Sequence, residues 1–219
     1  MDDLFAIAAR TRASLPLDVL ASLTLLAVVP FVAIMSTSFA RIVVVLSLVR
    51  SALGSPTLPP NAVLTGLALM LTFVVMAPTY ERISREAIQP YSRGHLSPSA
   101  FLARAIPPAR EFMLRQTHAR DIALFERVAH RPVAEEPRRA PLTVVVPAFV
   151  VGELRSAFAI GVALYLPFLA IDLAVAAILM GLGMMMLSPP IVSLPLKLLL
   201  FVSVDGWALV CAGVTSSFR

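Results

Sequence analysis

The chain has 219 residues, of which 58% are hydrophobic and only 14% are charged. Its mean hydropathy of +0.87 lies outside the range of ordinary soluble domains, so most of it must be covered by lipid or by other protein. The net charge of +5 arises mainly in one central stretch, where acids are interspersed among the arginines. This mixture excludes the continuous basic face that nucleic-acid binding requires.

Cysteine and histidine give no indication of metal chemistry. Cys211 is the only cysteine, so one chain offers neither an internal disulfide nor a cysteine-based metal site. The three histidines all lie in the polar centre, and their spacing matches no metal-ligand pattern. We therefore expect no bound metal and no cofactor.

The N-terminal part contains the best conventional transmembrane candidate. Residues 1–14 carry two acids and two arginines with no small-residue cleavage pattern, so we expect no cleaved signal peptide, although an uncleaved signal anchor fits. Leu15 to Met35 is apolar and long enough to span a bilayer, because a spanning helix needs about 20 apolar residues.

The later apolar runs are short or interrupted. None of the next three reaches a full span: Ile42 to Val49, Ala62 to Ala77 and Leu142 to Val151. In the C-terminal part, three closely spaced runs contain or stop at prolines and charges: Ala157 to Ile171, Leu173 to Leu187 and Ile191 to Val204. Irregular backbone at membrane depth needs protein or water around it, so the pattern predicts broken helical hairpins covered by other protein.

Five charges lie in this apolar C-terminal sequence: Glu153, Arg155, Asp172, Lys197 and Asp205. A charge at the centre of a lipid-facing span costs about 2.5–3.5 kcal/mol, so we expect these side chains to be buried against partners, a channel or one another. Lys197 is the only lysine of the chain, and we expect it to pair with Asp172, within a subunit or between neighbours. The alternative is that each charge reaches a headgroup or an aqueous edge independently.

A polar segment, residues 80–141, separates two hydrophobic segments, residues 1–79 and 142–219. Ser97-Pro98 followed by a periodic stretch predicts a helix start, Pro107-Pro108 predicts an interruption, and apolar residues recur at helical spacing over Ala109 to Val128. The polar segment is therefore predicted to form a small helical subdomain.

Three consecutive methionines, Met184, Met185 and Met186, stand between helix-breaking residues. Gly181 and Gly183 precede them and Ser188-Pro189-Pro190 follows, which predicts a loop. Methionines at apolar positions usually pack in a core, but their unbranched side chains would also suit a deformable constriction. From the residues alone, both interpretations stay open.

Polar, glycine and proline residues recur in short motifs in both halves of the chain. In the first half the motifs are Ser38–Ile42, Leu53-Gly54, Pro59–Asn61 and Gly66–Leu69. In the second half they are Val146–Val150, Glu153-Leu154, Pro167–Leu173, Met180–Leu187, Ser193–Phe201 and Asp205–Trp207. Together these motifs resemble the FliP/SctR family of export-gate proteins, and the resemblance includes their polar and glycine/proline positions. It covers nearly the whole chain from about Leu15 onward.

The resemblance implies an all-helical, non-enzymatic subunit of the bacterial inner membrane, in the export gate of a flagellar or type III secretion apparatus. It further implies a pentamer that joins two smaller gate subunits in a helical pore, works with large export-gate and switch proteins, and passes unfolded substrate proteins. The methionine triplet then becomes the expected constriction. The short, arginine-rich polar segment and the lack of a cleaved signal favour a non-flagellar system.

Two arguments disagree about which side of the membrane the polar segment faces. Eleven arginines against seven acids between Glu81 and Arg139 would place it in the cytoplasm by the positive-inside rule. The family resemblance places it in the periplasm, and we follow the resemblance because the rule is weak for long loops and domains.

Two other function classes were weighed against this prediction. A secondary transporter would use broken helices and charges at the midplane, but no repeat relates the two halves of this chain. An intramembrane aspartyl protease would need two facing aspartates, but Gly181-Leu182-Gly183 is followed by Met184 where such proteases require Asp. A serine protease in the membrane would need a histidine within an apolar span, and the histidines all lie elsewhere. The transporter is the stronger alternative.

Overall fold

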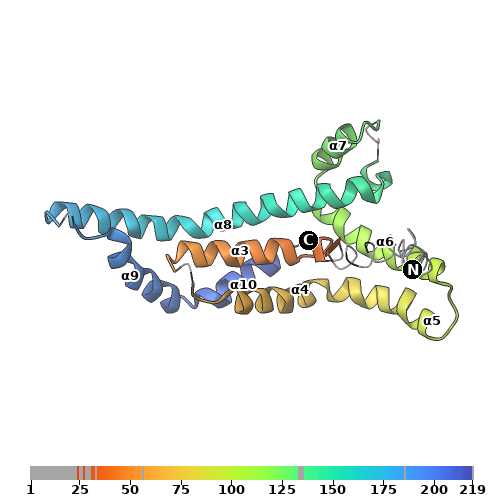
Figure 1. The fold of residues 1–219 in the computed structure, drawn as a ribbon, viewed down its shortest axis with the longest axis horizontal. Helices are drawn as coiled ribbons and strands as arrows, with labels where there is room; N and C mark the ends of the chain where they lie inside the picture. Colours follow the sequence, from red (N-terminus) through yellow and green to blue (C-terminus); the bar gives the residue numbers. More distant parts are fainter. Residues whose placement is uncertain are drawn as a thin grey trace, which may run out of the picture. The chain divides into compact units, whose positions relative to one another are not determined.

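The computed structural model describes residues 34–55, 57–132, 136–184 and 186–218, together with residues 24, 27, 31 and 32. Throughout these residues the regular structure is helical and contains no strand, which confirms the all-α fold class (Figure 1). The chain divides into two units, Met1–Ile34 and Met35–Arg219, and all named helices belong to the second. The expected first span, Leu15 to Met35, lies almost entirely outside the described residues.

The helices of the second unit fall into three groups along the chain. The first is α3 (Phe39–Ala52) and α4 (Asn61–Ile83), which a π-helical turn (Ser84–Ile88) extends into α5 (Gln89–Ser92). The second is α6 (Pro98–Gln116) and α7 (Ala119–Val128), followed by a short 3₁₀ turn (Pro137–Arg139). The third is α8 (Leu142–Gly181), α9 (Pro189–Ser203) and α10 (Gly206–Ser216).

The longest element, α8, corrects the prediction of broken C-terminal hairpins. One helix of 40 residues runs through Pro147, Pro167 and the charged stretch at Glu153. The helix continues there because its charges are paired with side chains of other helices rather than left in an apolar environment. The breaks in this part of the chain lie after Gly181, at the methionine loop, and between α9 and α10.

The polar segment also differs from its prediction in one respect. As expected, α6 begins at Ser97-Pro98, where the Ser97 hydroxyl accepts a hydrogen bond from the Ala100 amide at 3.3 Å. The predicted interruption at Pro107-Pro108 is wrong, because α6 continues through both prolines to Gln116. Burial of Phe112 and Met113 just beyond them offsets the lost backbone hydrogen bonds.

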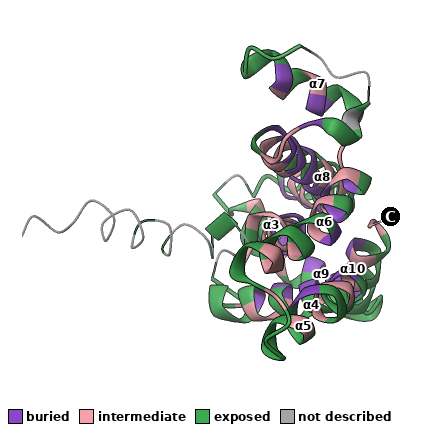
Figure 2. Cartoon of the chain, turned by 90° about the vertical axis from the view of Figure 1, so that its right-hand side faces the viewer, coloured by how far each residue is buried: buried purple, intermediate pink, exposed green. Residues whose placement is uncertain are grey.

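Two hydrophobic cores hold the unit together. Both views place α3 between α8 and α4, and the buried face of α3 forms the centre of the first core with residues of α4, α8, α9 and α10 (Figures 1 and 2). In the second core, Phe112 of α6 meets Phe149 of α8 edge to face with 5.9 Å between ring centroids. Phe218 packs against both cores, so the C-terminal residues join them.

The packing of α3 on α8 depends on a close helix approach. Gly161 of α8 lies directly against Leu48 of α3, and a Cβ atom at Gly161 would overlap with the Leu48 side chain. This approach keeps the two helices in register over their shared length.

Among the described residues, two helices are long and apolar enough to cross a membrane. They are Asn61–Ser92, of 32 residues, and Leu142–Gly181, while α9 and α10, bent by 67°, could form one broken span. The prediction that no later run reaches a full span is therefore wrong. At about 1.5 Å per residue, however, α8 is about 60 Å long, twice the hydrocarbon thickness of about 30 Å. A bilayer alone cannot cover it.

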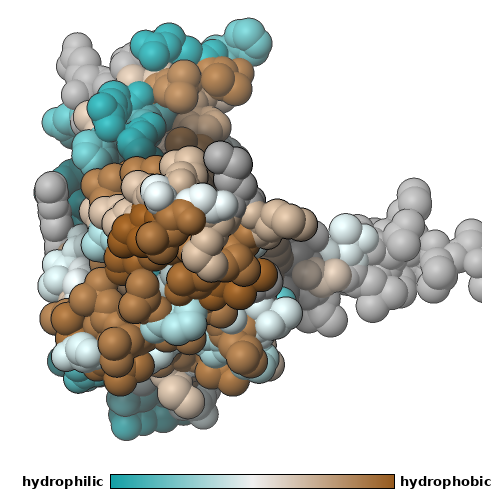
Figure 3. Space-filling model, turned by 90° about the vertical axis from the view of Figure 1, so that its left-hand side faces the viewer, coloured by the Kyte–Doolittle hydropathy of each residue, from teal (hydrophilic) through white to brown (hydrophobic). Residues whose placement is uncertain are grey.

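Large apolar side chains are exposed along these same helices. On α4 they include Phe73 and Val74, and on α8 they include Val162, Leu166 and Leu173. Figure 3 shows the resulting apolar surface in brown, below the hydrophilic top that α7 forms. Such a surface in a single chain indicates lipid or protein contacts outside it.

Candidate functional site

The hairpin formed by α8 and α9 carries the predicted ion pair. The Lys197 ammonium lies 2.6 Å from Asp172 Oδ2, and the Ser193 hydroxyl donates a hydrogen bond of 2.5 Å to Asp172 Oδ1. The lysine side chain is 5% exposed and the aspartate 27%. A Cβ atom at Gly54 would lie 3.8 Å from the ammonium, so the turn after α3 covers the pair from one side. The structure thus brings both residues together within one chain.

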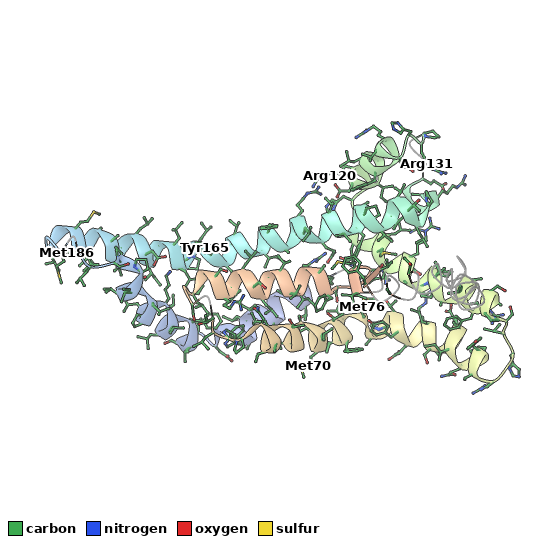
Figure 4. The ribbon with its side chains drawn as sticks, in the orientation of Figure 1. Met70, Met76, Arg120, Arg131, Tyr165 and Met186 are labelled. Atoms are coloured by element: carbon green, nitrogen blue, oxygen red, sulfur yellow. The ribbon has the colours of Figure 1, made fainter. Side chains whose placement is uncertain are left out.

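The methionine loop lies at the end of this hairpin. The α8 helix ends at Gly181, and Gly183 has a φ of +73°, a left-handed conformation that side chains other than glycine rarely adopt. Met184 and Met186 follow in a non-helical segment and are exposed, whereas Met185 lies outside the described residues. Met186 stands at the far end of the hairpin, well beyond Tyr165 on α8 (Figure 4).

A second ion pair is fully buried near the other end of α8. Arg41 of α3 donates two hydrogen bonds to Glu153, at 2.9 Å from Nε and 2.5 Å from Nη2. Its Nη1 donates to the backbone and side-chain oxygens of Ser217, at 2.9 and 3.0 Å. The guanidinium also lies 4.0 Å from the centre of the Phe218 ring, a cation–π contact. Arg41 therefore holds α3, α8 and the C-terminal residues together.

A third pair attaches α7 to α8. Arg155 makes a bidentate contact with Asp121, with hydrogen bonds of 2.7 and 2.8 Å, and its side chain is 42% exposed while that of Asp121 is 3% exposed. The hydrogen bonds from Arg155 hold the pKa of the Asp121 carboxyl below its ordinary value, against the opposing effect of burial. This pair docks the polar segment onto the hydrophobic half of the chain.

The five predicted charges thus fall into different environments. Glu153 is buried as expected and Asp172 and Lys197 lie together, but Arg155 and Asp205 are exposed in the single chain. Asp205 has a φ of 50° and precedes α10, so it belongs to the bend between α9 and α10 rather than to a buried span. For these two residues, the expectation of burial is not met within one chain.

Sequence reasoning missed the partners Arg41 and Asp121. Arg41 is the only charge between Phe39 and Val49, an apolar helical run, so the rule that identified Glu153 applied to it equally. Asp121 gave no comparable signal, because it lies among other charges on a short polar helix.

Comparison with known proteins matches this chain to the model of the FliP family over residues 22–214. The chain is 50% identical over 205 residues to the flagellar biosynthetic protein FliP of Pectobacterium carotovorum subsp. carotovorum, covering 94% of this chain and 80% of that protein. It is 47% identical to FliP of Bacillus subtilis (strain 168), covering 90% and 89%, respectively. With FliP of Caulobacter vibrioides the identity is 50%, covering 90% and 74%. These flagellar names go against the expectation of a non-flagellar system.

Proposed function

Because the chain belongs to the FliP family, we propose that it is a pore-forming subunit of the flagellar export gate, through which unfolded proteins cross the bacterial inner membrane. The exposed methionine loop at the end of the α8–α9 hairpin is the observation that carries this proposal. Several copies around an axis would bring the triplets together as a ring of soft, apolar side chains. Such a ring closes against water and yields to a passing polypeptide.

The surface of the single chain supports assembly with other subunits. The α8 helix is too long for a bilayer to cover and displays apolar residues, including Val162, Leu166 and Leu173. Neighbouring copies and other membrane subunits would bury this surface. By family resemblance, we propose a pentamer that binds two smaller gate subunits and meets the large export-gate and switch proteins.

The polar segment is proposed to face the periplasm, between the hydrophobic segments 1–79 and 142–219. It corresponds to residues 80–141, and α6 is the longest helix that lies entirely within it. The Asp121–Arg155 pair would then hold it against the entrance of the membrane assembly.

The Asp172–Lys197 pair is proposed to fix the hairpin that presents the methionine loop. The pair crosses from α8 to α9, and Ser193 adds a further hydrogen bond to the aspartate. A charge pair supported by a hydrogen bond holds one hairpin geometry more firmly than apolar contact alone, because the distances and directions of these bonds are restricted.

Site-specific crosslinking tests the proposal directly. Cysteines at Met184 and Met186, in a chain whose Cys211 is replaced by serine, should crosslink to a flagellar substrate stalled during export. A cysteine at Ala212, an exposed position of α10, is the matched control and should give no such product. A chain that purifies in mild detergent only as a small unit, without crosslinks from the loop, would favour a secondary transporter and contradict the pore.

A further inference from the structure

A groove lies between α6, α7 and the 3₁₀ turn that follows α7. Its volume is about 710 Å³, within the range of sites that hold a drug-sized molecule or a short peptide segment. The described residues that line it all belong to the polar segment, and none belongs to the methionine loop or to the Asp172–Lys197, Arg41–Glu153 or Arg155–Asp121 pairs.

The groove is positively charged. Of the residues that the structure describes, three arginines line it, Arg110, Arg115 and Arg138, together with one acid, Glu111. Glu111 is already bound, since Arg82 donates a hydrogen bond of 2.6 Å to it. This hydrogen bond is the main reason that the pKa of Glu111 is lowered. The positive charge of Arg138 lowers the pKa further. Glu111 is therefore shared between Arg82 and Arg115, whose Nη1 lies 3.8 Å from its other oxygen.

Among the described residues, Arg110 has no carboxylate partner. Its Nη2 donates to the backbone oxygens of Ala140 and Arg138, which are neutral acceptors. Its Nε is buried and has no hydrogen-bond partner among the described residues. Its guanidinium therefore has neutral acceptors only, and a carboxylate in the groove beside it would supply a counter-charge.

Apolar side chains occupy the rest of the lining. Ile106 and Leu114 come from α6 and Ile122 from α7, so arginines and aliphatic groups line the same depression. An inorganic anion is too small to fill this volume and would leave the aliphatic groups in water. An acidic peptide segment with interspersed apolar residues matches both the charge and the apolar lining.

We propose that this groove binds a short acidic and apolar segment of a partner protein, with carboxylates paired to Arg110, Arg115 and Arg138. Arginine suits this role because its planar fork binds a carboxylate through two parallel hydrogen bonds. The groove would bind such a segment whether or not the chain lines a pore.

Fluorescence anisotropy with the full chain in detergent tests this proposal. The probe is a short fluorescein-labelled peptide of alternating aspartate and leucine, and the matched peptide has asparagine in place of aspartate. The variant Arg115→Gln/Arg138→Gln should weaken binding of the aspartate peptide at least about tenfold, since it removes two charge-assisted contacts. Arg104→Gln, an exposed α6 position outside the groove, is the control and should leave binding unchanged.

Each outcome bears on the proposal. The double variant replaces Arg115 and Arg138 but keeps Arg110. Because the hydrogen bond from Arg110 to the Ala140 backbone supports the turn, the double variant should keep its fold. Equal binding by the wild type and the double variant would overturn the proposal, as would equal binding of the asparagine peptide. Complete displacement of the peptide by millimolar inorganic phosphate would instead identify a small-anion site and also overturn it.

Discussion

Arg41 and Glu153 are 112 residues apart in the sequence, yet their side chains meet inside the protein through two hydrogen bonds. Both side chains are almost completely buried. Gln116 of α6 lies 3.5 Å from the same guanidinium and Ser217 binds its other edge, so four segments converge on one cation. The pair therefore connects the first half of the chain to the second.

Removing one member of this pair should destabilise the chain strongly. Glu153→Leu leaves the Arg41 charge buried alone, and we expect a loss of about 3–5 kcal/mol in the free energy of unfolding. The double variant Arg41→Met/Glu153→Leu should lose less, because neither charge is then stranded. Thermal unfolding in detergent, followed by the fluorescence of the single tryptophan Trp207, measures both. Glu81→Gln, at an exposed position, is the control.

Changes to the Asp172–Lys197 pair should affect how much of the chain assembles into oligomers. Asp172→Asn and Lys197→Met each leave one charge without its partner, and we expect each to reduce the yield of the oligomer several-fold. The swap Asp172→Lys/Lys197→Asp restores opposite charges and should recover part of that yield. Size-exclusion chromatography of the detergent-solubilised complex gives the measurement. Equal damage in the single variants and the swap would argue against a direct pair.

The methionine loop should determine leakage rather than stability. Replacing Met184, Met185 and Met186 together by alanine shortens the side chains that would meet in the closed pore, and we expect increased permeation of small solutes. Assembly should stay largely intact, because Met184 and Met186 are exposed in the single chain. Solute flux into proteoliposomes that contain the purified complex measures the effect. An assembled variant without added leak would place the constriction elsewhere.

Acid should release α7 from α8. Since the folded state lowers the pKa of Asp121 below its ordinary value of 3.8, the ionised carboxylate stabilises docking fully above that value and loses its effect as pH falls through the lowered pKa. Hydrogen exchange of the α7 amides, corrected for intrinsic rates, should rise between about pH 4 and pH 2. Asp121→Asn should remove most of this pH dependence. Identical pH profiles for the wild type and the variant would contradict the assignment.

The close contact of α3 and α8 should not tolerate a methyl group. Gly161→Ala would overlap with Leu48, and we expect a loss of about 1–3 kcal/mol through overpacking. Gly213→Ala is the matched control, because a Cβ atom at this glycine of α10 has no neighbour within 4 Å. Alanine there should be neutral or slightly stabilising, since it favours helix formation. If the unfolding curves of the two variants coincide, α3 and α8 can move apart at little cost, which would contradict the prediction.

Local signals in the sequence predicted the helical content, the start of α6 and the loop around Gly183. The continuity of α8 was not predictable from the same signals. The sequence predicted interruptions at Pro147 and Pro167 and at the charges Glu153 and Arg155. It could not show that partners from distant parts of the sequence pair with these two charges. For the same reason the candidate Asp172–Lys197 pair could be proposed from two isolated charges, whereas the partner of Glu153 could not be named.

One continuous helix, α8, joins the buried Arg41–Glu153 pair in its first third to the methionine loop that follows its last residue. Glu153 and Gly181 lie on α8 with no break between them, about 42 Å apart at about 1.5 Å per residue. An unbroken helix transmits tilt along its length with little internal deformation, because bending it sharply would cost backbone hydrogen bonds. A change in the tilt of α8 at Glu153 would therefore become a larger sideways displacement at the methionine loop.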